Sequence, residues 1–444
     1  MEEFKKKGQE KNKISQLQTF PVPFFINEIN KNFSTGTNKK IKQSNKELID
    51  NAIHLHQQGN LQKASKYYQY CINNGINDHR VFSNYGAILK DLGKLQEAEI
   101  FTRKAIKINP KSAIAFNNLG NIFIDQGNLQ KAELYTRKAI KINPDYVKAY
   151  SNLGNILRSL GQLKESEASL QKAIELNPNS AEANYNLSCL ELLKEDYQSG
   201  LEKYEFRLNQ RKPTIPHKEI LIRKVDNEIL QKGEKLLVVS EQGLGDTLQY
   251  MRYVPYLRKK GLDVSFCAQK KLHSIIKASG IDPGPMTQEQ SILVSEGKWI
   301  PLLSLPRYLK VRPNNVIISE PYISSNDELK NKWKNILSKE KRPIVGINWQ
   351  GNKQLENTYQ GRSIPLETFS ILCERNKITM LSLQKGFGSE QLNNCSFQNK
   401  FVECQSQIDS TWDFLENAAI IHNCDLIITN DTSVAHLAGG MGKK

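Results

Sequence analysis

The feature that most constrains this chain is a repeat of 34 residues in its first half. The glycines Gly86, Gly120 and Gly154 mark this spacing most clearly. A glycine at such a position lets two helices cross closely, and a proline after each helix pair stops the second helix. The sequence therefore predicts stacked helix pairs. The predicted repeats start near residues 45, 79, 113, 147 and 181.

Other residues repeat in the same register. They are turn glycines, second-helix alanines and closing prolines: Gly93, Gly127 and Gly161; Ala105, Ala139 and Ala173; and Pro110, Pro144 and Pro178. The pattern resembles the tetratricopeptide repeat (TPR) family, which implies an α-solenoid of about five repeats over residues 45–210. The polar, basic residues 1–44 are expected to form a disordered tail. Because a solenoid of this kind holds other chains, any chemistry has to come from elsewhere in the protein.

A second series with the same spacing consists of asparagines on the first helix of each repeat. Its members are Asn84, Asn118, Asn152 and Asn186. A carboxamide offers both a donor and an acceptor, so a row of them can bind the backbone of an extended peptide without reading its sequence. The series resembles the asparagine ladder in the TPR arm of O-linked N-acetylglucosamine transferases. The alternative is that asparagine is simply common at this position of the repeat.

The second half of the chain has the pattern of an α/β fold. A proline-containing linker over residues 211–233 separates it from the repeats. The predicted elements are strands at 236–239, 264–268, 344–348, 379–383 and 425–429, with helices at 247–258 and 366–376. We expect two Rossmann-like, doubly wound lobes over residues 234–325 and 326–444, with a cleft between them.

Five segments of this half resemble, in order, the motifs of heptosyltransferase-like (glycosyltransferase family nine) domains of GT-B fold. They are Ser240–Gln249, Gly346–Asn352, Arg362–Pro365, Ser382–Gly386 and Asn430–Gly439. The resemblance implies a glycosyltransferase that uses a nucleotide-sugar donor as substrate and needs no cofactor. Its acceptor would be a protein or glycoconjugate held by the TPR array. The rival interpretation is an interaction scaffold with an inactive transferase-like domain.

The proposed general base is Asp246, which corresponds to the base proposed for the resembling heptosyltransferases. An aspartate at the start of a helix stays ionised, because the helix dipole and free N–H groups favour the anion. The alternative role is that of a plain N-cap for a helix starting at Thr247. Gly243 and Gly245 form the tight turn before Asp246 and are assigned to the donor site.

The nucleoside diphosphate that leaves is expected to bind where a helix begins after the last strand. Helix N-termini favour anions, and the turn that opens this helix ends at Ser433, which is assigned to the donor site. The resemblance implies contacts from Asp431, Thr432 and His436. For Asp431 the alternatives are holding a sugar hydroxyl or capping the helix. For His436 the alternative is a purely structural role, which is the usual one for a lone histidine in a helix.

Two basic residues are further candidates for this site. Arg362 and Lys385 follow strands of the second lobe and are able to neutralise a diphosphate. The alternative for both is membership of a generally lysine-rich surface.

Composition and missing motifs exclude several other functions. The formal charge of +16 suggests acidic partners, yet no nucleic-acid-binding motif occurs, so we expect no nucleic-acid partner. The dinucleotide fingerprint is incomplete and no P-loop occurs, so we expect neither NAD binding nor a P-loop NTPase. No D-x-D motif is present, so we expect no metal site. Seven scattered cysteines and the lack of a transmembrane segment indicate a cytoplasmic protein. The chain stops where the resembling family continues with another strand, so the second lobe is expected to be incomplete.

Overall fold

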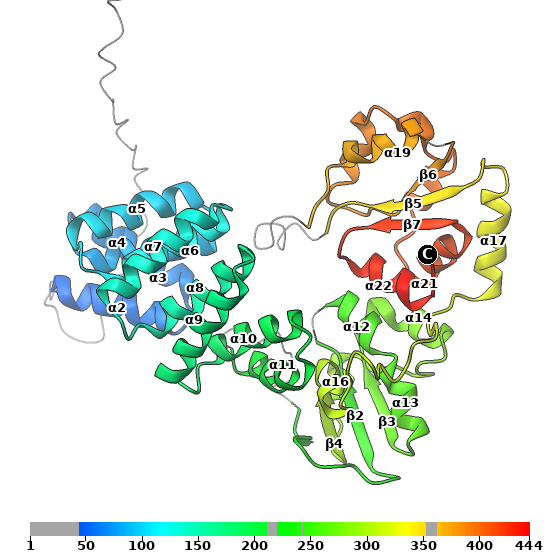
Figure 1. Ribbon diagram of the computed structural model, residues 1–444, viewed down its shortest axis with the longest axis horizontal. Helices are drawn as coiled ribbons and strands as arrows, with labels where there is room; N and C mark the ends of the chain where they lie inside the picture. Colours follow the sequence, from blue (N-terminus) through cyan, green and yellow to red (C-terminus); the bar gives the residue numbers. More distant parts are fainter. Residues whose placement is uncertain (1–43, 211–219, 242, 352–361, 376) are drawn as a thin grey trace, which may run out of the picture.

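The computed structural model describes residues 44–210, 220–241, 243–351, 362–375 and 377–444 (Figure 1). The predicted tail, apart from Ser44, and the first part of the predicted linker lie outside these residues, as do Gln242 and Asn352 of the motif segments. Within the described residues, none of the helices has both the length and the apolar character needed to cross a membrane.

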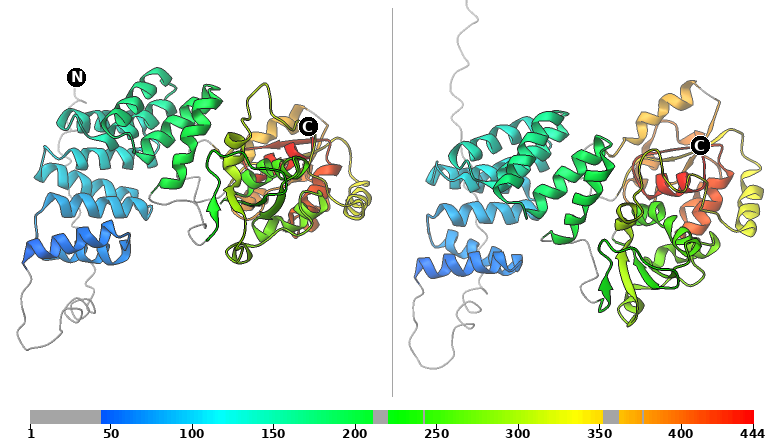
Figure 2. Two further views of the ribbon diagram at one scale, coloured as in Figure 1. Left: turned by 90° about the horizontal axis from the view of Figure 1, so that it is seen from below. Right: turned by 60° about the horizontal axis from the view of Figure 1, so that its bottom comes forward.

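The first half is a series of antiparallel helix pairs, stacked side by side in both views of Figure 2. The helices are α2 (Asn45–Gln57), α3 (Leu61–Asn73), α4 (His79–Asp91), α5 (Leu95–Ile108), α6 (Ala113–Asp125), α7 (Leu129–Ile142), α8 (Val147–Ser159), α9 (Leu163–Leu176), α10 (Ala181–Leu193) and α11 (Tyr197–Tyr204). The first helix of each pair begins at the predicted position. A short 3₁₀ helix, η1 (Glu205–Asn209), follows α11.

The glycine and proline spacing fixes this register. A β-carbon on Gly120 would lie 2.4 Å from the Thr136 hydroxyl oxygen on the paired helix, so only glycine allows the two helices to approach this closely. Gly127 has a φ of 78° in the turn between the same helices, a conformation that glycine adopts without strain. Pro144 follows the end of α7 at Ile142, as predicted.

The second half contains two small parallel sheets, which appear on the right of Figure 1. The first has the order β1-β4-β2-β3, from β1 (Arg223–Lys224), β2 (Lys235–Val239), β3 (Asp263–Cys267) and β4 (Lys298–Pro301). The second has the order β6-β5-β7, from β5 (Ile344–Asn348), β6 (Thr379–Ser382) and β7 (Leu426–Thr429). The α/β class is as expected, but the sheets are smaller than full doubly wound lobes.

Short helices surround the two sheets. Those of the first sheet are α12 (Leu244–Tyr250), α13 (Tyr253–Lys259), η3 (Lys270–Leu272), α14 (His273–Ala278), α15 (Gln288–Ser291), η4 (Leu302–Ser304) and α16 (Leu305–Tyr308). Those that follow are α17 (Asp327–Leu337), η5 (Leu366–Phe369), α19 (Ser370–Arg375), η6 (Ser389–Asn394), η7 (Gln398–Lys400), α20 (Gln405–Asp409), α21 (Phe414–Asn423) and α22 (Ser433–Gly440).

The single helix predicted at 247–258 is wrong in its bounds. The structure has two helices there, α12 and α13, separated at Met251 and Arg252. Pro255 explains the break, because it has no N–H group to donate to the carbonyl of Met251 in a continuous helix. The first of the two helices also begins earlier than predicted, at Leu244.

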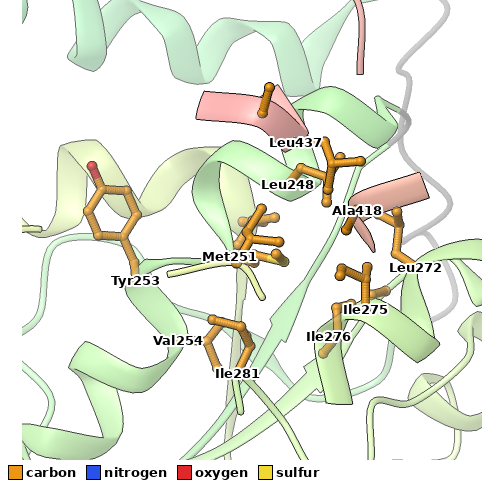
Figure 3. Packing of buried hydrophobic residues seen from close by; sticks show 14 of the residues in the cluster. Leu248, Met251, Tyr253, Val254, Leu272, Ile275, Ile276, Ile281, Ala418 and Leu437 are labelled. Atoms are coloured by element: carbon orange, nitrogen blue, oxygen red, sulfur yellow. The ribbon is translucent and has the colours of Figure 1, made fainter. Parts of the chain in front are cut away.

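One apolar core joins the two sheet units (Figure 3). Leu248 and Met251 of the first unit pack in the same cluster as Ala418 of α21 and Leu437 of α22. Each of these four residues is at most 1% exposed, and Ala438, which follows Leu437, is 5% exposed. The helices α12 and α22 therefore meet across the boundary between the sheets, and this contact positions the candidate site.

Candidate functional site

The candidate site lies at the position in each sheet where successive connections run to opposite sides of one strand. In each sheet the first long strand, β2 or β5, has later strands on both sides. Parallel sheets bind ligands at the carboxyl ends of strands at such positions. The loop after β2 leads into α12, and the loop after β7 leads into α22. Figure 1 shows these two helices next to each other between the sheets.

The two units approach each other closely at Gly245. A β-carbon there would lie 2.6 Å from Cδ2 of His436 and 3.5 Å from Cα of Ser433. The first of these contacts is too close for any residue but glycine unless a neighbour shifts. The structure thus brings the predicted residues Gly245, Ser433 and His436 together from opposite sides of the boundary.

Asp246 projects from the first turn of α12. Its side chain folds back over Gly243. This is shown by the space beside Gly243, where an added β-carbon would lie only 2.1 Å from Asp246 Oδ2. The alternative role as an N-cap of a helix from Thr247 is wrong, since the helix begins at Leu244 and its N-cap is Gly243. Among the described residues, no hydrogen bond occupies the Asp246 carboxylate, so it is free for another role.

The charges around Asp246 come from both units and from the repeat array. Burial raises the pKa of the Asp246 carboxyl above its usual value, and His436 opposes this shift. Asp431 raises the pKa further, whereas Arg362 and, last, Arg207 lower it. A buried carboxyl with a raised pKa is a better proton acceptor than an exposed one.

Arg362 and Asp431 form an ion pair at the start of α22. One terminal nitrogen of Arg362 lies 2.6 Å from Asp431 Oδ2 and donates to the Asp431 carbonyl at 2.7 Å. His436 Nε2 lies 3.9 Å from the other carboxylate oxygen, Oδ1. The N-cap residue of α22 is Thr432, so the alternative that Asp431 caps this helix is wrong.

A hydrogen-bond chain connects the carboxyl ends of the three strands of the second sheet. Thr432 Oγ1 donates to Asn348 Oδ1 at 2.9 Å, and Asn348 Nδ2 donates to Gln384 Oε1 at 2.8 Å. The same Gln384 oxygen accepts from the backbone N–H of Trp349 and Gln350. The start of α22 is therefore held at a fixed place relative to the loop after β6.

Two buried polar atoms near Arg362 were not singled out by the sequence. Asn430 is 7% exposed, and its Nδ2 donates to the Arg362 carbonyl at 2.9 Å. Its Oδ1 atom and the hydroxyl oxygen of Ser363 are buried, and neither has a partner among the described residues. Unpaired buried polar atoms are costly, and a bound ligand is one way of satisfying them. Both residues lie in motif segments of the sequence, Arg362–Pro365 and Asn430–Gly439, and that was the available signal.

Lys385 lines a cavity of about 650 Å³, whose lining includes neither Asp246 nor His436. Its ammonium group donates to the carbonyl of Ile408, and burial lowers the pKa of Lys385 to about 8. Asp409 and Glu416 oppose this shift. Trp412, whose side chain is 68% exposed, also lines the cavity. Gln384 lines it too and connects it through Asn348 to the start of α22.

The four asparagines of the ladder link successive helices of the array. The Nδ2 atom of Asn118 donates to Ser83 Oγ at 3.0 Å, and that of Asn152 donates to Asn117 Oδ1 at 2.9 Å. Asn186 makes the equivalent bond to Ser151 at 3.0 Å, and Asn84 donates to the Tyr68 hydroxyl at 3.2 Å. At least one N–H donor of each asparagine is therefore used inside the array. All four side chains remain partly exposed.

Comparison with known families identifies the repeats. Residues 113–146 and 147–180 each match the tetratricopeptide repeat family, and residues 79–112 match a second description of the same repeat. Residues 79–180 are tetratricopeptide repeats. These matches have the repeat length that the glycine spacing predicts, and the expected TPR solenoid is confirmed. Comparison with curated proteins finds no match.

Several solved TPR structures are similar to the chain over this part. A thermophilic TPR protein from Thermus thermophilus has 18% identity, covers 38% of this chain and 92% of its own, and gives a TM-score of 0.35. MamA from Desulfovibrio magneticus has 21% identity, covers 38% and 97%, and gives 0.31. YrrB, described as a TPR protein with an unusual peptide-binding site, has 20% identity, covers 42% and 91%, and gives 0.30.

Proposed function

We propose that the protein is a glycosyltransferase whose TPR array holds a protein or glycoconjugate acceptor. The observation that carries the proposal is the meeting of Asp246 and His436 across the boundary of the two sheets. Each lies on the helix that follows the carboxyl end of a strand, where parallel sheets bind ligands. We interpret the two sheet units as the lobes of a GT-B fold. The seven cysteines are all free thiols, which favours a cytoplasmic location.

In this proposal Asp246 removes the proton from the acceptor hydroxyl. Its raised pKa suits a base that works near neutral pH, and its carboxylate has no competing bond among the described residues. The acceptor oxygen then forms a bond to the anomeric carbon of the donor sugar. The bond between that carbon and the diphosphate oxygen breaks, and its electron pair leaves with the nucleoside diphosphate.

The leaving diphosphate would bind at the start of α22. Three features there suit an anion: the positive end of the α22 helix dipole, His436, and the guanidinium of Arg362. Asp431 already pairs with Arg362 at 2.6 Å, so it reduces the positive charge and is better suited to a sugar hydroxyl. The unpaired oxygen of Asn430 is able to accept from a second hydroxyl. The chain has no D-x-D motif, so the mechanism is proposed to be metal-independent.

The nucleoside would occupy the cavity beside Lys385. The hydrogen-bond chain from Gln384 through Asn348 to Thr432 connects this cavity to the diphosphate position. Trp412 presents an exposed aromatic face on which a base is able to stack. Lys385 is therefore proposed as a nucleoside-side contact rather than a contact to the reacting sugar.

The concave side of the TPR array would hold the acceptor. The Nδ2 atoms of the ladder already donate once each to the preceding repeat, which leaves the Oδ1 acceptors and, for Asn152 and Asn186, a second N–H for a ligand. Such a row suits the backbone N–H and C=O groups of an extended polypeptide. This supports a peptide partner that is recognised with little dependence on its sequence.

The proposed function is tested by calorimetric titration of UDP, GDP and ADP, each alone and in the presence of EDTA. We expect one of them to bind, and expect His436→Ala and Arg362→Ala to weaken it about tenfold each, or about 1.4 kcal/mol. The matched control is Arg342→Ala, which removes an exposed ion pair with Asp425 elsewhere in the second unit. Lack of binding by all three diphosphates would contradict the proposal.

The second candidate is an interaction scaffold without transferase activity. The observation in its favour is that the matched family, over residues 79–180, is one that builds binding surfaces for other proteins. A peptide selected from a random library by the full chain, together with no diphosphate binding, would favour the scaffold. Binding of both would favour the transferase.

A further inference from the structure

The end of the TPR array is buried against the first sheet unit. Tyr204, the last residue of α11, packs against the core that joins the two sheets. Arg207 follows in η1 and is 6% exposed, although it lies only a few residues before the end of the array. An arginine is buried to this extent only when its charge and its donors have partners.

The partner of Arg207 is Glu241, the second residue after β2. Nε of Arg207 lies 3.0 Å from Oε1 and Nη2 lies 3.1 Å from Oε2, so the two side chains form a two-bond pair. Glu241 is 5% exposed, and its Oε2 also accepts from the backbone N–H of Leu303. The remaining donors of Arg207 reach Glu205 Oε1 at 2.9 Å and Ser304 Oγ at 2.9 Å.

The same network continues to the helix that carries Asp246. Gln269 Nε2 donates to the Glu241 carbonyl at 2.6 Å, and Gln269 Oε1 accepts from the Thr247 hydroxyl at 2.9 Å. Thr247 is completely buried and directly follows Asp246. A continuous series of hydrogen bonds thus runs from the array to the first turn of α12.

We propose that Arg207 is a positioning residue for Asp246: through Glu241 it fixes the turn from which Asp246 projects, so the end of the array forms part of the site. The role of Asp246 as a base rests on the proposed function, whereas the mechanical link does not. The array is then more than a tether for an acceptor. It completes the site, and a chain lacking η1 would carry a loosened Asp246.

The charges near Asp246 add a second effect of Arg207. Asp246 faces His436, Asp431 and Arg362 from the second unit, and Tyr204 and Tyr250 from the array side and from α12. Arg207 is one of the positive groups that lower the pKa of Asp246. Loss of its charge therefore moves the titration of Asp246 to higher pH.

The first experiment measures hydrogen exchange of the α12 amides in the full chain, without ligand. We expect Arg207→Met to speed this exchange about tenfold or more, because it leaves Glu241 buried without its partner. The matched control is Arg103→Met, which removes an exposed pair with Glu99 in the middle of the array and should leave α12 unchanged. Unchanged α12 exchange in a folded Arg207→Met protein would overturn the proposal.

Arg207→Lys covers the case in which Arg207→Met does not fold. Lysine keeps the charge but lacks the two-pronged geometry, so α12 should exchange faster than in the wild type. Equal exchange in Arg207→Lys and the wild type would also overturn the proposal.

The second experiment follows the pH dependence of carbodiimide labelling at Asp246 by mass spectrometry. The labelling midpoint should move to higher pH in Arg207→Met and move less in Arg207→Lys. A role confined to stability would leave it unchanged. Because neither readout needs a ligand, failure of all diphosphates to bind the wild type would contradict the proposed function without touching this result.

Discussion

A β-carbon on Gly245 would lie 2.6 Å from Cδ2 of His436, so α12 and α22 touch at the point where the two sheet units face each other. Gly245→Ala should force these helices apart. We expect a loss of about 1–3 kcal/mol of unfolding free energy, as for other overpacked sites, and weaker diphosphate binding. Gly439→Ala is the control on α22, because a β-carbon there meets no atom within 4 Å. Denaturant unfolding measures both, and equal stability of the two variants would contradict the close contact.

The hydroxyl of Thr136 is completely buried and has no partner among the described residues. Thr136→Val replaces it with a methyl group of similar shape, so the TPR array should gain about 1 kcal/mol. Thr411→Val is a control of opposite sign, since the Thr411 hydroxyl donates to the Ile408 carbonyl at 2.7 Å. Thermal unfolding of both variants measures the difference. A destabilised Thr136→Val protein would count against the packing at Gly120.

The side-chain Nδ2 of Asn152 donates a hydrogen bond of 2.9 Å to Oδ1 of the buried Asn117. Asn152→Ala should therefore cost about 1–3 kcal/mol, because Asn117 is only 3% exposed and loses its donor. Asn121→Ala is the matched control, since its side chain makes no hydrogen bond to a described residue. Chemical denaturation separates this stability effect from any loss of peptide binding. Equal stability of the two variants would show that the ladder does not hold the repeats together.

Burial lowers the pKa of Lys385 to about 8, so near pH 8 about half of this amine is neutral. An ordinary lysine with a pKa of about 10.4 has roughly a hundredfold less neutral amine at that pH. Reductive methylation followed by mass spectrometry should label Lys385 before the exposed Lys400, with a midpoint near pH 8. Parallel labelling of the two residues at all pH values would contradict the shift. A bound nucleoside diphosphate should slow the labelling at Lys385 alone.

The lowered pKa of Lys385 also predicts the direction in which the unfolding free energy changes with pH. The unfolded chain keeps Lys385 protonated up to about pH 10.4, whereas the folded chain loses that proton near pH 8. The unfolded state therefore binds more protons between these values, and the contribution of Lys385 to the unfolding free energy rises with pH in this window. Comparison of Lys385→Met with the wild type between pH 7 and pH 10 isolates this contribution. A Lys385→Met protein whose stability changes with pH in the same way as the wild type would contradict it.

The repeats were predictable because their signals are local. Gly120 and Gly127 each serve one helix pair, and their spacing carries over from one repeat to the next, so periodicity alone places the helices. The bounds of α12 and α13 were not predicted correctly. Pro255 was the available signal, since a proline inside a helical pattern removes the hydrogen bond to the residue four positions earlier.

The site was only partly predictable. The motifs that carry Asp246 and His436 are visible in the sequence, but their meeting depends on the packing of α12 on α22. Arg207 stands where the repeat pattern fades, and its partner Glu241 lies 34 positions further along, in a different fold class. A buried ion pair between such segments leaves no periodic trace in the sequence. The pairing of Arg362 with Asp431 escaped prediction for the same reason.

The shared interior of the two sheet units has a consequence for how a substrate enters. Leu248, Ala418 and Leu437 belong to one continuous core, so swinging one unit away from the other would wet these side chains at roughly 25 cal/mol for each Å² exposed. Entry of a substrate by separation of the two units therefore has a high free-energy cost. A molecule that reaches Asp246 has to pass instead between side chains that stay in place, and its size is limited by the space they leave.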